Sequence, residues 1–444
     1  MDILVALSSQ KLFNQAIDIF GFKKILSPPG KQFPNLEDYL GFDLTTGTLI
    51  HLHVHYALVL GEKFIKNHHL PLESLFFRHL IPSSQGLWIP CPELELIVLV
   101  LRAHMKTDLV SLAKHQIKDF LGHSYIPFPD NIKEEFDELI KCSDLDKARL
   151  IYRESRLPLH EDIVFGFIRE LSEGSLRARS VALRKIQILH GLRGYQRQNN
   201  FAAYGKYIGQ YIQRLPLLAR FIVSKKKTFC DGGKVFAVVG ADGAGKSTLI
   251  GDLEAWLSWK VIVKRTYYGI PKSSVIQMGF WIVQKLEKLS LNHLSKELNA
   301  LLWLIIAHKR FVTAVKAQAL AAKGILVLSD RFPMKDFHKM TNPMDGPRLF
   351  GSNSWFSQRE SLYYQNLVYP NRIFVLKVAF DELRKRKTDL PLDIHMLKAE
   401  AVNSITEREG IIIVDANRSY EEVLLQIKTL IWQELVKATY ERGK

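Results

Sequence analysis

The chain has 444 residues, a length that predicts two or three domains rather than one. Hydrophobic residues make up 47% and charged residues 24% of it, and this balance excludes a wholly disordered protein. The formal net charge of +16 predicts an attraction for anions.

Cysteine usage and apolar runs indicate where such a protein resides. The cysteines Cys91, Cys142 and Cys230 form no C-x-x-C pair, which excludes a zinc ribbon and a disulfide framework and favours a reducing compartment. The first residues lack the pattern of a signal peptide. The apolar runs 94–101 and 301–307 are too short to cross a bilayer. We therefore expect a cytoplasmic protein without a transmembrane segment.

The N-terminal region, residues 1–125, mixes short apolar runs with turn signals and predicts a mixed α/β unit. Its start, residues 2–6 followed by a helix to about residue 23, resembles small nucleotidyltransferase domains. Those domains carry a metal-binding Gly-Ser-x-x-Asp-x-Asp segment, of which only the last acid, Asp2, has a match here. The resemblance implies a nucleotidyltransferase-like region that is inactive as given. Either the domain has lost its chemistry or the assigned start codon lies too far downstream.

Three histidines alternate along a predicted strand of this region. Strand geometry places His51, His53 and His55 on one face. Imidazoles at this spacing suit Zn²⁺, and they lie where the third acid of a nucleotidyltransferase would lie. The alternative is a polar sheet surface of hydrogen-bonded histidines.

Residues 126–228 predict a basic helical segment that ends in a lysine-rich linker. Between residues 175 and 230 there are twelve Lys or Arg residues and no Asp or Glu. Such a block predicts either docking to an anionic membrane surface or polymer, or a set of solvated helices. Docking would make the protein peripheral to the inner membrane face. The sequence leaves an oligomer open.

A phosphate-binding loop follows a β-branched run at residues 234–239, a pattern typical of a buried parallel strand. Residues 240–248 match G-x-x-x-x-G-K-[ST], and an amphipathic helix follows. Glycines allow the backbone to wrap closely around phosphate, and the helix N-terminus adds a favourable dipole. Residues 229–444 therefore predict an α/β domain with a parallel sheet flanked by helices. The residues expected to hold ATP are Gly240, Asp242, Gly243, Ala244, Gly245, Lys246, Ser247 and Thr248.

The next acidic strand narrows the class of P-loop protein. The run 324–330 ends in Asp330 and Arg331, and no N-K-x-D guanine motif is present. An ATPase needs a second carboxylate to activate water, whereas a kinase excludes water and binds a second anion. Arginine suits that anion, so the pair favours a kinase.

These motifs resemble the thymidylate kinase family. The likeness rests on the loop, the basic residues at 308–310, the Asp-Arg-Phe at 330–332, the strand 369–376 with the basic helix after it, and the final strand and helix from 411. It covers about 210 residues by its motifs. After Asp330 and Arg331, residues 333–339 and 344–348 depart from the family's thymidine-binding element.

The resemblance implies roles for individual residues. Lys246 and the loop would bind ATP, and Ser247 with Asp330 would bind Mg²⁺. Asp242 would face the sugar of the acceptor, while Lys309, Arg310 and Arg331 would hold its phosphate. Lid cations would offset the charge of the transition state, or else form a solvated basic helix. Those lid cations are Arg384, Arg386 and Lys387.

Two functions follow from the sequence. One is an ATP-dependent kinase that phosphorylates a nucleotide monophosphate such as dTMP or a related phosphate acceptor. Its expected catalytic residues are Lys246, Asp330, Arg331 and Arg386, and Arg384 would also contact ATP. The other is an ATP-binding regulatory or scaffold protein in surface-polysaccharide biosynthesis with little turnover.

Overall fold

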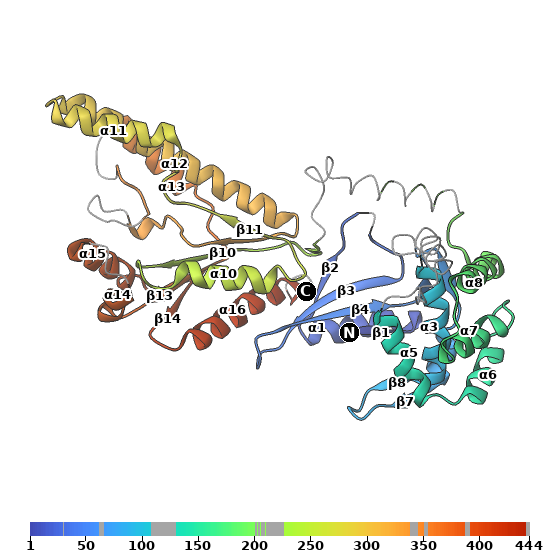
Figure 1. The fold of residues 1–444 in the computed structure, drawn as a ribbon. Coiled ribbons are helices and arrows are strands. Elements are labelled where there is room, and N and C mark those ends of the chain that lie inside the picture. Colours follow the sequence, from blue (N-terminus) through green and yellow to red (C-terminus); the bar gives the residue numbers. More distant parts are fainter. Residues whose placement is uncertain are drawn as a thin grey trace.

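The computed structural model describes residues 1–29, 31–61, 66–107, 130–199, 226–337, 345–349, 354–386 and 391–440, with Ala202, Gly205 and Gly209. Two five-stranded β-sheets and a group of helices follow one another across the described part of the molecule (Figure 1). The helices pack beside the N-terminal sheet, and the sheet that contains the phosphate-binding loop lies at the other end.

The N-terminal sheet is mixed. In the described residues its strand order is β1-β4-β3-β2-β9, with β1 parallel to β4 and the other neighbours antiparallel. Its elements are β1 (Asp2–Leu4), α1 (Gln10–Ile19), β2 (Lys23–Leu26), β3 (Leu36–Phe42), β4 (Leu49–His55) and β9 (Thr228–Phe229). Two small hairpins and a short helix follow β4: β5 (Leu58–Leu60), β6 (His68–Leu70), α2 (Glu73–Arg78), β7 (Leu80–Pro82) and β8 (Trp88–Pro90).

A helical unit follows this sheet. Its first helix, α3 (Pro92–Lys106), begins with a proline and two acids in its first turn, as helix starts require. The apolar face of α3 shares one buried core with the helices α5 (Asp130–Cys142), α6 (Leu145–Glu154), α7 (Asp162–Ser172) and α8 (Ala178–Gly191). The described residues of the segment that the sequence predicts to be helical contain these last four helices, α5 to α8. The expected boundary at 125/126 lies outside the described residues, but the helical core already begins on its N-terminal side with α3.

The end of the segment before the phosphate-binding loop, which the sequence predicts to be a linker, is part of a β-sheet in the structure. Thr228 and Phe229 form β9 at the edge of the N-terminal sheet, and Lys227 pairs with Val261 beside the second sheet. The Lys227 ammonium also forms an ion pair with the buried carboxylate of Asp38. The lysine-rich composition predicts a solvated segment, but the tertiary contacts hold Lys227 between the two sheets.

The second sheet is parallel throughout, with strand order β11-β12-β10-β13-β14 in the described part of the chain. All six residues of its central strand are buried, as the β-branched run predicted. The strands are β10 (Val235–Gly240), β11 (Val263–Thr266), β12 (Leu326–Ser329), β13 (Arg372–Lys377) and β14 (Ile411–Asp415). The predicted parallel sheet flanked by helices is confirmed.

Helices cover both faces of this sheet. Figure 1 shows α10 and α16 on one face and the long helices α11 and α12 with α13 on the other. Their bounds are α10 (Lys246–Leu257), α11 (Ser274–Lys288), α12 (Asn292–Ala322), α13 (Trp355–Gln365), α14 (Phe380–Arg386), α15 (Leu392–Asn403) and α16 (Tyr420–Tyr440).

One helix of the described chain, α12, is long and apolar enough to cross a membrane by length and composition alone. Core helices of soluble proteins meet the same criterion. In this fold α12 packs against α11, α13 and the strands β10 and β12. It also carries the buried Arg310, which contacts the site described next.

The two sheets share one hydrophobic core. Phe42 of β3 packs edge-on against Trp256 of α10 and lies 5.9 Å from the ring of Trp432 of α16. The Trp432 indole donates a hydrogen bond to the Gly21 carbonyl at 3.1 Å. The N-terminal sheet is therefore packed directly onto the phosphate-binding unit.

Candidate functional site

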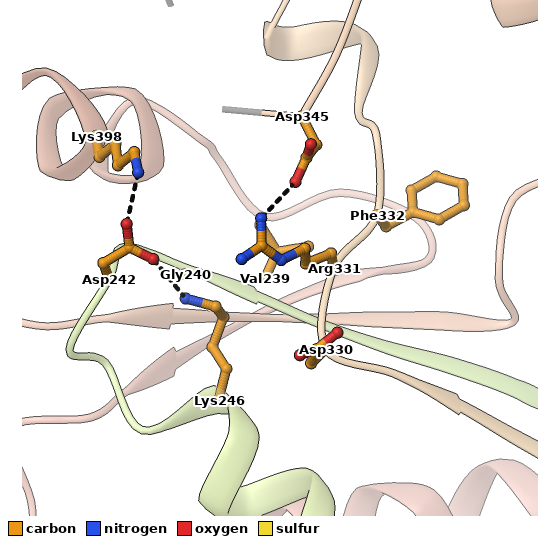
Figure 2. A pocket seen from close by; sticks show the side chains of 9 residues that line it. All are labelled: Val239, Gly240, Asp242, Lys246, Asp330, Arg331, Phe332, Asp345 and Lys398. Atoms are coloured by element: carbon orange, nitrogen blue, oxygen red, sulfur yellow. Dashed lines mark hydrogen bonds and ion pairs between the residues drawn. The ribbon is translucent and has the colours of Figure 1, made fainter. Parts of the chain in front are cut away.

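The site lies where the central parallel strands end. Strand β10 runs into the glycine-rich loop, and its neighbour β12 runs into Asp330 and Arg331. The carboxyl ends of adjacent parallel strands form a crevice in sheets of this kind. Here a cavity at that edge is lined by the end of β10, by the loop, by the residues that follow β12, and by Asp345 and Lys398 (Figure 2).

The loop has the backbone that a phosphate-binding turn requires. Gly243 and Gly245 adopt φ values of 88° and 84°, in the left-handed region that glycine enters without strain. Gly245 is the residue before α10, so the free N–H groups of the helix start face the loop. Ser247 and Thr248 lie exposed in the first turn of this helix. The loop is therefore built to surround an anion.

Lys246 lies within the loop with its ammonium turned back onto it. Its Nζ donates a hydrogen bond to the Ala241 carbonyl at 2.7 Å and lies 3.9 Å from Asp242 Oδ1. Burial lowers the pKa of Lys246 to about 8, and the positive charges of Arg331 and Lys398 act in the same direction. Near neutral pH the ammonium is charged but poorly solvated, so an incoming phosphate would stabilise it.

Asp242 is held from the opposite side by helix α15. The Lys398 ammonium lies 2.5 Å from Asp242 Oδ2, and His395 Nε2 is 3.0 Å from the Asp242 carbonyl oxygen. Figure 2 shows Asp242 between Lys398 and Lys246. The sequence assigned Asp242 to the sugar of the acceptor, but in this structure its carboxylate is engaged by two lysines.

Asp330 and Arg331 both line the cavity, as the motif predicts. Ser329 Oγ donates to the Arg331 carbonyl at 2.6 Å and so fixes the turn after β12. The oxygens of Asp330 and Ser247 are the hard donors that Mg²⁺ prefers, and they come from the two elements that border the loop. The donor set therefore fits a magnesium ion held with a nucleotide.

Asp345 joins two arginines, and no sequence motif predicted it. One of its oxygens lies 3.2 Å from Arg331 Nη1, and the other lies 2.6 Å from Arg310 Nη2. Arg310 is 3% exposed and also donates to the Tyr268 carbonyl at 2.8 Å and to the Tyr364 hydroxyl at 2.8 Å. Arg310, assigned to the acceptor phosphate, is thus mainly committed to protein groups. It positions Asp345, which in turn positions Arg331.

A second cavity of about 190 Å³ adjoins this arginine cluster. Its lining includes Tyr267, Lys272, Lys309 and Arg310. The Arg331 guanidinium lies 5.7 Å from the centre of the Tyr267 ring, so a side chain of the first cavity contacts a side chain of the second. Lys309, unlike Arg310, is exposed. The two cavities are therefore connected through Arg331, Asp345 and Arg310.

The predicted lid residues do not reach the cavity in this conformation. Arg384 and Arg386 lie exposed on α14, and neither is among the residues that line the first cavity. Lys387 lies outside the described residues. The cation that this part of the chain does supply is Lys398 of α15, for which the sequence offered no signal beyond a lysine on an expected helix.

The basic block is only partly a solvated face. Arg184 forms an ion pair with Glu170 at 2.5 Å, and the buried Lys185 donates to the Thr107 carbonyl at 2.6 Å. Lys227 is bound to Asp38. Arg177, Arg179 and Arg193 are exposed. Lys206, Arg214, Arg220 and Lys225 lie outside the described residues.

Comparison with known proteins gives relatives of part of the chain. No protein-family model matches it. The uncharacterized ATP-binding protein YghR of Escherichia coli (strain K12) is 30% identical over 219 residues, a match that covers 44% of this chain and 86% of YghR. The uncharacterized ATP-binding protein YghS of the same strain is 26% identical over 171 residues. This match covers 34% of this chain and 70% of YghS.

Among the solved structures that align with the chain is deoxyadenosine kinase from M. mycoides with bound dATP, at 13% sequence identity and a TM-score of 0.31. The alignment covers 45% of this chain and 98% of that one.

Proposed function

We propose that this chain, which belongs to the family of the Escherichia coli ATP-binding protein YghR, is an ATP-dependent phosphotransferase of the nucleotide-kinase type. One observation carries this proposal. Asp345 links Arg331 of the phosphate-binding cavity to Arg310 of a second cavity, so that a cavity suited to a donor and a cavity suited to an acceptor are joined through this aspartate.

On the donor side, the loop binds the phosphates of ATP. The backbone N–H groups at the start of α10 face the α- and β-phosphates, and Lys246 moves from the Ala241 carbonyl onto the β- and γ-phosphates. A bound Mg²⁺ would neutralise phosphate charge. Ser247 and Asp330 are the residues that would hold it.

On the acceptor side, Arg331 binds the group that receives the phosphoryl. The second cavity adds the exposed ammonium groups of Lys272 and Lys309 and the ring of Tyr267. Two lysines favour an anionic acceptor, and a tyrosine offers a face for a base. The acceptor is therefore a nucleoside monophosphate such as dTMP or a related phosphorylated molecule.

Transfer depends on position and charge rather than on a protein nucleophile. Arg331 lines the first cavity and contacts Tyr267 of the second, so its positive charge can stabilise the negative charge that develops as the phosphoryl group moves. Asp345 holds this guanidinium in place, so Arg331 needs little reorganisation at the moment of reaction. Closure of α14 would bring Arg384 and Arg386 toward the same charge.

The experiment is ADP production from ATP and Mg²⁺ with a panel of nucleoside monophosphates, dTMP included. Wild type should turn over at least one acceptor well above its rate without acceptor. Lys246→Ala should reduce that rate by a factor on the order of a hundred or more, because it removes a charge from the transferring group.

A matched control is Lys296→Ala, which alters an exposed lysine on α12 away from both cavities. It should keep wild-type turnover. The proposal fails if wild type and Lys246→Ala give the same background on every acceptor while both proteins melt at the same temperature.

A further inference from the structure

The face of β4 that carries His51, His53 and His55 lies between the carboxylates of Asp2 and Asp38. The spacing of these acids in the sequence did not predict this arrangement. In the sheet register, His53 of β4 is directly opposite Asp2 of the parallel strand β1 and opposite Asp38 of the antiparallel strand β3. Residues opposite one another on adjacent strands project from the same face of a sheet. His51 and His55 flank His53 on this face, while Leu52 and Val54 are buried on the other.

Asp38 orients the central histidine. This carboxylate is 5% exposed, and His51 Nε2 and His53 Nδ1 lie 2.9 Å and 2.8 Å from its Oδ1. The Lys227 ammonium forms an ion pair with the same carboxylate, which favours its ionised form. An ionised carboxylate only accepts, so His53 donates through Nδ1. Its Nε2 therefore carries the lone pair that a metal ion requires.

His55 and Asp2 complete a set of three ligands. The rings of His53 and His55 are 4.7 Å apart between centroids, and His55 Nε2 lies 3.7 Å from Asp2 Oδ1. This distance is too long for a hydrogen bond. It is close to the separation of about 3.3 Å between two ligand atoms that each lie about 2 Å from one tetrahedral ion. One ligand atom from each of Asp2, His53 and His55 lies within 4.8 Å of the others.

We propose that Asp2, His53 and His55 bind one divalent transition-metal ion of the Zn²⁺ type, with Asp38 as the residue that positions His53. Two imidazoles and one carboxylate favour Zn²⁺ over Mg²⁺, which prefers oxygen ligands. The Asp2 side of the site is open to solvent, so an ion can enter there.

Two lysines act on this site. Lys227 neutralises Asp38 from the side of the second sheet. Lys66 lies with its ammonium over the Phe33 ring, and its charge acts on His55. A positive charge beside a three-ligand metal favours an anionic group at the open coordination position. The site is therefore suited to a metal-bound anion, and it is separate from the phosphate-binding loop.

The test is metal binding by the full chain without an affinity tag. Protein stripped with a chelator and dialysed is titrated with Zn²⁺ and with Co²⁺, and the metal content is measured by mass spectrometry. Wild type should bind one equivalent of Zn²⁺. Bound Co²⁺ should give the visible absorption bands of an ion with a low coordination number. His55→Ala and Asp2→Ala should each weaken binding by at least about tenfold, since each removes one of three ligands.

Two controls separate this site from other sources of binding. His293→Ala removes an exposed histidine of α12 and should leave Zn²⁺ binding unchanged. Lys246→Ala should also retain the metal, because the phosphate-binding loop takes no part. Asp2 is exposed, so Asp2→Ala should keep the melting temperature of the metal-free protein. The proposal is overturned if wild type binds no equivalent of Zn²⁺ or Co²⁺, or if His55→Ala and Asp2→Ala bind as wild type does.

Discussion

The Lys398 ammonium lies 2.5 Å from Asp242 Oδ2, while the Lys246 ammonium approaches the other oxygen of the same carboxylate at 3.9 Å. Asp242 is thus shared between the lysine of the phosphate-binding loop and a lysine of α15. The ion pair with Lys398 keeps Asp242 from neutralising Lys246, which leaves Lys246 available to phosphate.

Lys398→Met should therefore weaken ATP binding about tenfold. Without Lys398, Asp242 pairs with Lys246 alone and competes with the phosphates for its charge. Isothermal titration with ATP and Mg²⁺ measures the affinity. Lys385→Met, on the exposed face of α14, is the matched control and should bind as wild type does.

A double-mutant cycle distinguishes this mechanism from a direct contact of Lys398 with phosphate. If Asp242 is the intermediary, Asp242→Asn should recover most of the affinity that Lys398→Met loses. Losses that simply add would show that Lys398 acts on the nucleotide itself.

Arg310 and its neighbour Lys309 should have opposite phenotypes, although the sequence assigned both to the acceptor. Arg310→Met removes the closer of the two arginines that bind the half-buried Asp345 and leaves the Tyr268 carbonyl without this donor, so it should lower the free energy of unfolding by about 3–5 kcal/mol. Lys309→Ala should change it by less than about 0.5 kcal/mol, because this side chain is exposed.

Urea denaturation measures the two stabilities, and acceptor kinetics supply the second readout. Lys309→Ala should raise the KM for the phosphorylated acceptor and leave ATP affinity unchanged. Equal stability losses in both variants would contradict the assignment of Arg310 to the protein core.

ATP binding should take up protons near pH 8. The pKa of Lys246 is about 8 in this structure, and phosphate contact restores the charged form, so about half a proton should bind per ATP at pH 8. Calorimetric titrations in two buffers of different ionisation enthalpy measure this uptake. Lys246→Arg keeps its charge at this pH and should show none. Equal uptake by both proteins would locate the proton elsewhere.

The stability of the helical unit should fall in mild acid through His104. This side chain is fully buried in α3, with Nδ1 2.8 Å from the Val100 carbonyl oxygen, and burial lowers the pKa of His104 to about 4. In the unfolded chain its pKa is about 6.5, so the unfolded state binds the proton first as the pH falls. The contribution of His104 is complete above pH 6.5 and is lost between pH 6.5 and 4, by about 3 kcal/mol.

His104→Leu removes this titration while keeping an apolar side chain against Phe167. The difference in unfolding free energy between wild type and His104→Leu should therefore change by about 3 kcal/mol across this pH range. His293→Ala, in an exposed position, should follow the wild-type curve. A constant difference between wild type and His104→Leu would contradict the shifted pKa.

The sequence predicted the phosphate-binding side of the site well, because its parts are local. The β-branched run, the glycines and the lysine lie within about fifteen consecutive residues, and short-range geometry places them together. Strand alternation likewise placed His51, His53 and His55 on one face, as the structure confirms. The sequence could not distinguish Arg310 from Lys309, because helix phase decides which of two adjacent residues is buried.

Asp345, Lys398 and the register that aligns Asp2, His53 and Asp38 had no signal in the sequence. Each contacts a partner from a distant part of the chain. Arg310 and Asp345 are 35 residues apart in the sequence, and Asp242 and Lys398 are 156 residues apart. A single charged residue in a polar stretch of sequence does not indicate which distant residue it will contact in the fold.

The phosphate-binding loop, the parallel sheet around it and the faces of the strands could be predicted from the sequence, since they depend on side-chain periodicity and glycine conformation. The pairing of charges could not be predicted, because it depends on how distant elements pack. Lys227, part of an apparent linker, is bound to Asp38 between two sheets, and Asp242 is held by α15. The physical reason is that a buried charge requires a partner, and the packing of whole elements, not local sequence, brings that partner within reach.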